Sequence, residues 1–161
     1  MNKEDLLLLI VALVVFAGVF YAATFFKTPE TTVKGVRVIG ADWKASIQKT
    51  LAADNIVIRE ELVNASDRRN SAVGAMGAEL ARAMRALNKT VAAYGMVEGI
   101  PSIACNNASN NCAGEQIIVR VGQCDCIDTR GSAMIVEGSA DFLLNNLVNV
   151  RDVIYGSVAS G

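Results

Sequence analysis

The chain has 161 residues, of which 52% are hydrophobic, and its formal net charge at neutral pH is -1. This length is sufficient for one domain and a short additional segment, and the near-zero charge argues against a nucleic-acid-binding surface. The absence of histidine excludes Ser-His-Asp and Cys-His catalytic arrangements within the chain. Because no phosphate-binding glycine motif is present either, we expect a protein without cofactor that is not an enzyme.

The longest apolar segment is Leu6–Phe26, which carries no charge. A helix of this length spans roughly 30 Å, the thickness of the hydrocarbon core of a bilayer. The segment is longer than the apolar part of a secretory signal, lacks a small-residue cleavage site, and has no polar face. Lys27 and Pro29 follow aromatic residues typical of a membrane interface. We therefore predict a membrane anchor over residues 1–27, with the lipid bilayer as its partner.

The same segment resembles the mature N-terminus of type IV pilin-like subunits. A short polar head with an acidic residue at position five, Asp5, precedes a long apolar helix, and the resemblance covers Met1–Phe26. Asn2, Lys3 and Glu4 are more polar than the usual start of that family. The resemblance implies a repeating subunit whose apolar helix packs in a filament core instead of in lipid.

Two observations bear on the side of the membrane that the domain occupies. Lys27, Lys34 and Arg37 follow the span, and by the positive-inside rule they place the domain in the cytoplasm. Clustered cysteines and Asn-x-Ser/Thr sequons favour an exported domain instead. We predict an extracytoplasmic domain, with possible glycosylation at Asn64, Asn88 and Asn107.

Beyond the apolar segment we predict a polar connector over residues 28–32 and one α/β domain with a mixed sheet over residues 33–161. The first expected elements alternate between strand and helix, which favours parallel pairing with right-handed crossovers. Asp42 can cap the first of these helices. In chain order the elements are a strand over Val33–Gly40, a helix from Trp43, a strand at Ile56–Ile58, a helix over Ser71–Leu87 and a strand over Val91–Val97.

The helix over Ser71–Leu87 has an apolar face and a slim one. Gly74, Gly77, Ala78 and Ala81 allow another backbone to approach closely. The apolar stripe consists of Val73, Met76, Leu80, Met84 and Leu87.

The pattern changes in the last third of the chain. Short strands at Ile117–Val121, Cys124–Ile127 and Met134–Glu137 predict a small meander or hairpin at the edge of the sheet. Ser139 can cap a final helix. The apolar face of that helix carries Leu143, Leu147, Val150 and Ile154.

The sequence has four cysteines: Cys105, Cys112, Cys124 and Cys126. An even, clustered set in an exported domain predicts two disulfides. A Cys105–Cys112 bridge that closes the loop is preferred, although its complement joins two residues whose Cα atoms in a regular strand lie near the upper limit for a disulfide. If Cys124 and Cys126 are strand residues, each more readily reaches a loop cysteine. A four-thiolate zinc or iron–sulfur site is the alternative, but the spacing lacks paired C-x2-C motifs.

The turn at Gly138 and Ser139 is a further candidate site. Free backbone amides at a helix start can bind an anion, although an ordinary capped turn explains the same residues. Asp125, Asp128 and Glu137 suggest a cation site, but in a regular strand the two aspartates point to opposite faces. We therefore predict no metal site.

Together these features favour a non-catalytic, membrane-anchored interaction or assembly module outside the cytoplasm, which binds a protein partner or itself. A pilin-like filament subunit is the first alternative. A cysteine-based redox or metal-binding protein is the second.

Overall fold

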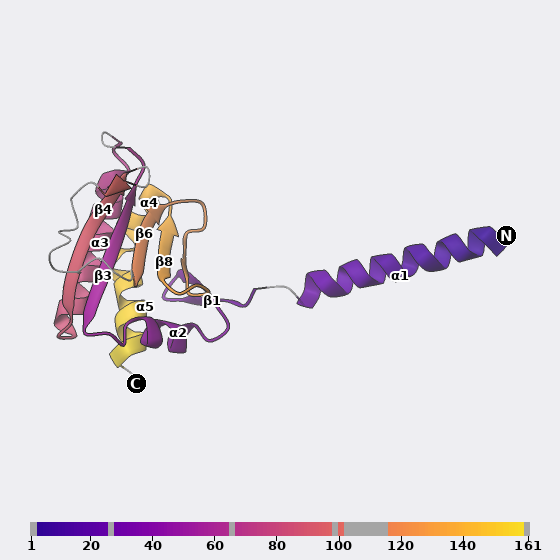
Figure 1. The fold of residues 1–161 in the computed structure, drawn as a ribbon, viewed down its shortest axis with the longest axis horizontal. Helices are drawn as coiled ribbons and strands as arrows, with labels where there is room; N and C mark the ends of the chain where they lie inside the picture. The colour runs from indigo at the N-terminus through magenta and orange to yellow at the C-terminus, as the bar shows by residue number, and fades with distance from the viewer. Residues whose placement is uncertain (1–2, 26–27, 65–66, 98–99, 102–115, 160–161) are drawn as a thin grey trace.

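The structure, a computed structural model, describes residues 3–25, 28–64, 67–97, 100–101 and 116–159. Figure 1 shows an N-terminal helix, α1, that extends away from a domain in which helices pack on a twisted sheet. The sheet contains both parallel and antiparallel pairs. The predicted mixed α/β class is therefore confirmed.

Helix α1 spans Lys3–Phe25. Its side chains are described over residues 8–21, and all of them are exposed. Within the part of the chain that the structure describes, no helix has both the length and the hydropathy needed to cross a membrane. The membrane anchor stays a prediction.

The described residues form one eight-stranded sheet with the order β1-β2-β7-β8-β6-β3-β4-β5. The central strands β8, β6, β3 and β4 are mutually parallel, whereas β7 pairs antiparallel with β8. The strands are β1 Glu30–Val33, β2 Val36–Ile39, β3 Asn55–Leu62, β4 Thr90–Val97, β5 Ile100–Pro101, β6 Ile117–Val121, β7 Cys126–Asp128 and β8 Met134–Gly138.

The helices of the domain are α2 Trp43–Thr50, α3 Asn70–Ala86, α4 Ala140–Asn145 and α5 Leu147–Ala159. Helix α3 packs on β3, β4 and β6 and also contacts α4 and α5, while α2 packs against α5. The predicted stripe on α3 lies in the core, where Val73, Met76, Leu80 and Met84 are fully buried. These residues belong to the same buried apolar cluster as Ile58 and Val119 of the sheet.

The predicted strand over Val33–Gly40 is instead a hairpin of β1 and β2. Lys34 and Gly35 form its two-residue turn with φ angles of 51° and 78°. Positive φ at both turn residues matches the twist of the flanking strands, and glycine adopts it without steric cost. Because of this turn, Glu30–Val33 belongs to the sheet, although residues 28–32 were expected to be a connector.

Two predictions for the last third of the chain are wrong. Strands β7 and β8 do form an antiparallel hairpin, but the three strands do not lie at the sheet edge: β6 lies between β8 and β3, and β7 lies between β2 and β8. The predicted final helix is two helices, because α4 ends before Asn146 and α5 begins at Leu147. The cap at Ser139 is confirmed, since its side chain accepts a hydrogen bond from the Phe142 N–H, whereas Asp42 makes no side-chain cap.

Candidate functional site

A row of side chains crosses the sheet on the face opposite the helices. Its members are register neighbours on five adjacent strands, so they project from the same face. The residues one position earlier or later in these strands, such as Val119 and Val136, lie in the core beneath the helices. We call this set the cross-strand row; it consists of Glu61, Arg120, Glu137, Cys126 and Arg37.

Charges in the cross-strand row are paired between strands. Arg120 Nη2 lies 2.5 Å from Glu137 Oε2, and Arg120 Nη1 lies 3.7 Å from Glu61 Oε2. The second oxygen of Glu137 accepts a hydrogen bond from the backbone N–H of Cys124 at 3.3 Å. Glu137 therefore connects the ion pairs of β6 and β8 to the segment that leads into β7.

That segment is the cysteine turn, which we define as Cys124, Asp125 and Cys126. The two sulfurs lie at disulfide-bonding distance, and the Cα atoms are 5.2 Å apart. Asp125 has a φ of 49°, in the left-handed region, so the chain bends there instead of continuing as a strand.

The bend corrects the expectation that Cys124–Ile127 is a strand, because β7 begins only at Cys126. It also removes the geometric objection to the Cys124–Cys126 pair. The Cα separation falls inside the usual disulfide range. The preferred partner bridge, Cys105–Cys112, lies outside the described residues.

The start of α4 binds a carboxylate from the cysteine turn. Asp125 Oδ1 accepts a hydrogen bond from the Ser139 N–H at 2.7 Å. Gly138 permits this approach, since a Cβ atom at that position would lie 2.8 Å from the same oxygen and would collide with the Phe142 ring. The amide predicted to hold an anion is thus engaged by Asp125, and an external anion would have to displace it.

The two cysteines of the turn differ in environment. Cys126 is fully buried, whereas Cys124 is partly exposed. Arg37 Nη2 donates a hydrogen bond to Cys124 Sγ at 3.3 Å, and Arg37 Nε lies 3.9 Å from Glu30 Oε2. The partly exposed Cys124 sulfur therefore lies beside the Arg37 guanidinium, and a positive charge in this position favours the thiolate form of a cysteine.

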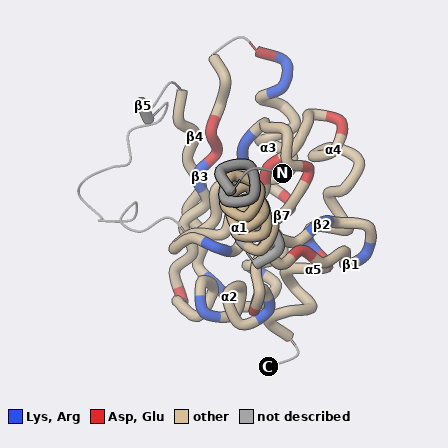
Figure 2. The backbone as a smooth tube through the Cα atoms, turned by 90° about the vertical axis from the view of Figure 1, so that its right-hand side faces the viewer, with Lys and Arg blue, Asp and Glu red and all other residues tan. Residues whose placement is uncertain are grey.

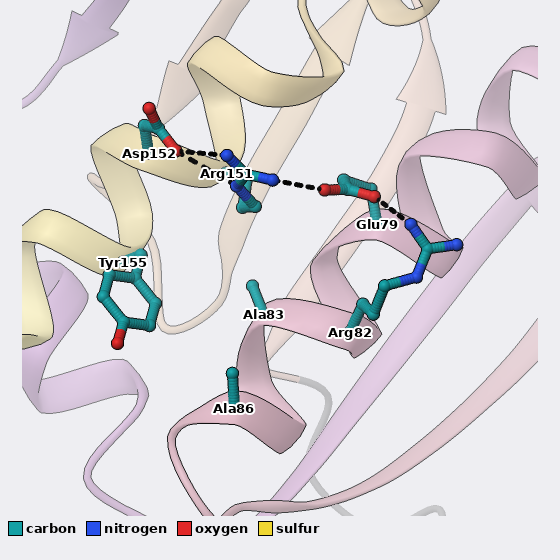
Figure 3. A pocket seen from close by; sticks show the side chains of 7 residues that line it. All are labelled: Glu79, Arg82, Ala83, Ala86, Arg151, Asp152 and Tyr155. Carbon is teal, nitrogen blue, oxygen red and sulfur yellow. Dashed lines mark hydrogen bonds and ion pairs between the residues drawn. The ribbon is translucent and has the colours of Figure 1, made fainter.

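A second candidate is a groove between α3 and α5 with a volume of about 390 Å³. Figure 3 shows Arg151 of α5 reaching toward Glu79 of α3 across the groove. Arg151 Nη1 lies 2.9 Å from Glu79 Oε1, and Arg82 pairs with the other oxygen of the same carboxylate. We call this the α3–α5 groove; it is lined by Glu79, Arg82, Ala83, Ala86, Arg151, Asp152 and Tyr155.

Ion pairs join the charged residues that line the groove. Hydrogen bonds to Asp152 and Glu79 raise the pKa of the Arg151 guanidinium. The hydrogen bond from Arg151, together with the one from Lys34, lowers the pKa of the Asp152 carboxyl. Lys34 belongs to the turn of the β1–β2 hairpin, so these contacts also tie that hairpin to α5.

The remaining predicted site residues are separate from both candidates. Asn64 and Asn88 are exposed and lie in loops at opposite ends of α3. Cys112 and Asn107 lie outside the described residues, as does Cys105. Among the side chains that the structure describes, no group of three or more His, Cys, Asp or Glu residues could hold a metal ion.

The contacts at the candidate site that sequence reasoning missed are those made by Arg37 and Glu137 to the cysteine turn. Neither residue belongs to a motif, and Arg37 lies 87 positions before Cys124. The one signal available was that Arg37 alternates with buried valines in a strand. The α3–α5 groove likewise joins residues 72 positions apart, Glu79 and Arg151.

Neither the distribution of charge nor the comparison with known proteins adds support to the two candidate sites. Figure 2 shows acidic and basic residues interspersed over the domain, without one sign gathering on one side. Comparisons of the chain with models of protein families, with curated proteins and with solved structures found no match.

Proposed function

We propose that this chain is a non-catalytic, membrane-anchored interaction module whose domain lies outside the cytoplasm. The observation that carries the proposal is the exposure of α1. Its described large apolar side chains, from Leu8 to Tyr21, are 52–74% exposed. The part of α1 that follows Asp5 is uncharged and has apolar side chains on every side, so it requires an apolar environment, which lipid or another apolar helix supplies.

The domain offers a surface for a partner protein or a second copy. Leu144, Val148 and Tyr155 are large side chains that remain 46%, 53% and 39% exposed. The spacing of Val148 and Tyr155 places them on one side of α5, and Tyr155 also lines the α3–α5 groove. Exposed apolar groups beside a groove with paired charges are typical of a protein contact surface.

The cysteine content supports the location outside the cytoplasm. Disulfides persist in oxidising compartments and are rare in the cytosol. Cys124 and Cys126 lie at disulfide-bonding distance. Asn64 and Asn88 are exposed, as glycosylation acceptors must be.

Membrane extraction of the full chain tests the anchor. We expect the chain to stay with membranes after an alkaline carbonate wash. Gly18→Arg should raise the fraction of the chain that the wash releases, because an arginine at the centre of a span costs about 2.5–3.5 kcal/mol. Ala45→Arg, at an exposed position of α2, is the matched control and should behave like the unmodified chain. Complete release of the unmodified chain by the wash would contradict the anchor.

Accessibility to protease tests the orientation. A protease added to intact cells should digest the domain if it faces outward. Digestion that occurs only after the cells are lysed would place the domain in the cytoplasm and overturn that part of the proposal.

Chemical cross-linking in detergent tests the contact surface. Val148→Asp should weaken cross-linking to a second copy or to a co-purified protein, whereas Ala45→Asp should not. Equal cross-linking by the two variants would exclude the exposed face of α5 as the contact surface.

A pilin-like filament is the alternative use of α1. The acidic head, Glu4 and Asp5, belongs to the helix itself, which begins at Lys3. Electron microscopy of surface material distinguishes the two functions, because a filament subunit gives regular fibres and a lipid anchor does not.

A further inference from the structure

The cysteine turn has properties that a structural disulfide does not need. A bridge between residues two apart closes a very short loop, so it removes little conformational freedom from the unfolded chain. Cys126 pairs in register with Arg37 on β2 and Glu137 on β8, and Asp125 is bound to the Ser139 N–H. The turn is thus held in place by contacts that do not involve the sulfur–sulfur bond.

The two sulfurs are also unequal in the way that exchange chemistry requires. Cys124 is partly exposed and can be reached by an incoming thiolate, whereas Cys126 is fully buried in β7. An accessible sulfur that is attacked and a shielded sulfur that resolves the intermediate make up a dithiol exchange pair.

Arg37 provides the charge for such a site. Its guanidinium donates to Cys124 Sγ at 3.3 Å. Glu137 is paired with Arg120 through one oxygen and accepts from the Cys124 backbone N–H through the other, while Asp125 accepts from Ser139. Glu30 approaches the Arg37 guanidinium at 3.9 Å. Arg37 is therefore the charged group that directly faces the exposed sulfur and favours its thiolate.

We propose that Cys124 and Cys126 form a thiol–disulfide exchange site that takes two electrons from a dithiol of another protein or passes two electrons to a disulfide. This goes beyond anchoring and assembly, and it does not depend on them.

The exchange balances in two steps. A thiolate of the partner attacks Cys124 Sγ and forms a mixed disulfide; the Cys124–Cys126 bond breaks, and the Cys126 sulfur takes a proton from solvent. The second partner thiolate then attacks the partner's own bridged sulfur, and Cys124 leaves as a thiolate beside Arg37. The partner dithiol is oxidised to a disulfide and the cysteine turn is reduced, and the reverse sequence oxidises the turn.

The test uses the full chain in detergent micelles with Cys105→Ser and Cys112→Ser, so that the cysteine turn carries the only thiols. This two-cysteine parent is equilibrated in buffers of oxidised and reduced dithiothreitol, and free thiols are counted by alkylation. We expect two thiols to appear reversibly while the fluorescence of Trp43, the single tryptophan, stays native. Reduction that occurs only together with unfolding would overturn the proposal. If the parent does not fold, mass mapping of alkylated peptides in the unmodified chain gives the same readout.

Single-cysteine variants of the parent test the inequality of the sulfurs. With Cys126→Ser, the remaining Cys124 should form a mixed disulfide with oxidised glutathione at least tenfold faster than Cys126 does in the Cys124→Ser variant. Equal rates would contradict the assignment of Cys124 as the exchanging sulfur.

Substitution of the arginine tests its role as a positioning residue. In the Cys126→Ser background, Arg37→Met should slow the reaction with glutathione about threefold to tenfold, because fewer molecules carry the thiolate while the remaining thiolates are better nucleophiles. Arg37→Lys should restore part of the rate. Arg130→Met, which removes an exposed arginine bonded to Asp128, is the matched control and should leave the rate unchanged. An unchanged rate with Arg37→Met would exclude thiolate stabilisation by Arg37.

Discussion

Asp125 and Ser139 are joined by a hydrogen bond from the Ser139 N–H to Asp125 Oδ1, 2.7 Å long, which connects the cysteine turn to the start of α4. One carboxylate thus satisfies a free amide at a helix start and fixes a residue with a φ of 49°. The stability of α4 and the geometry of the disulfide therefore depend on the same side chain.

Replacing Asp125 should destabilise the domain. Asp125→Ala leaves the helix amide without its partner and keeps a left-handed residue, so we expect a loss of about 1–2 kcal/mol in the free energy of unfolding. Asp125→Asn retains an acceptor and tolerates positive φ, so it should lose less. Chemical denaturation followed by Trp43 fluorescence measures both. Asp42→Ala is the control, because Asp42 stands before α2 without a side-chain cap; an equal loss there would contradict the capping role of Asp125.

Two glycines of α3 should respond oppositely to alanine. A Cβ at Gly74 meets nothing within 4 Å, so Gly74→Ala should raise the free energy of unfolding by about 0.4–1 kcal/mol. A Cβ at Gly77 would collide with the Glu60 carboxyl group, which must then move, so Gly77→Ala should be the less stable variant. A double-mutant cycle with Glu60→Ala should remove the difference. Equal effects of the two alanines would show that Glu60 does not constrain the helix.

The same glutamate should make stability depend on pH. Burial raises the pKa of the Glu60 carboxyl above its ordinary value. The Glu60 carboxyl therefore stays protonated to a higher pH in the folded state than in the unfolded state. The stability that this protonated form contributes is lost as the pH rises through the pKa of the folded state. Glu60→Gln does not titrate, so its stability relative to the unmodified domain should be greater at pH 7 than at pH 4. Denaturation at both pH values measures the difference.

Asp67 provides the comparison of opposite sign. A hydrogen bond from Arg69 lowers the pKa of the Asp67 carboxyl to about 2. The stability that the ionised Asp67 carboxylate contributes to the fold is present above the ordinary carboxyl pKa and is lost as pH falls toward 2. Asp67→Asn should therefore lower stability at pH 7 and have no effect near pH 2. If the relative stabilities of the two variants changed in the same direction with pH, one of the two assignments would be contradicted.

The ion pairs of the α3–α5 groove should contribute unequally to the free energy of unfolding. Arg151 joins α5 to α3 through Glu79, and its side chain is 35% exposed, whereas Arg82 is 73% exposed. Exposed pairs contribute little, so we expect Arg82→Ala to lower the free energy of unfolding by less than Arg151→Ala does. Denaturation at low and high salt measures the loss of stability in both variants. Equal losses would show that the contact of Arg151 with Glu79 between the two helices contributes no more than the exposed Arg82 pair.

The elements that local pattern determines were predicted well. Helix α3 was expected over Ser71–Leu87 and spans Asn70–Ala86, because its apolar stripe repeats with the helical period. Strand β6 has the expected bounds, Ile117–Val121. The hairpin was missed because Lys34 supplies a positive φ that its residue type does not suggest.

The order of the strands and the candidate sites could not be predicted in the same way. Cys124 was expected in a strand because nothing in the sequence marks Asp125 as left-handed; its hydrogen bond to Ser139 forms only in the folded domain. Pairing of β6 between β8 and β3 depends on contacts between segments distant in sequence, which local periodicity does not report. The contact of Arg37 with Cys124 follows from that pairing.

The position of β6 also determines when the domain can fold during synthesis. Strand β3 has β4 on one side, but its other edge stays unpaired until residues 117–121 of β6 leave the ribosome. The partner of β2 on its inner side, β7, is synthesised later still. Parallel pairings between segments so far apart form slowly, and an open strand edge can pair with another chain. The complete sheet therefore cannot form until most of the chain has been made, and an incompletely folded chain is the state that can be threaded through a membrane channel. The helix that would direct it there, α1, is the first element to be made.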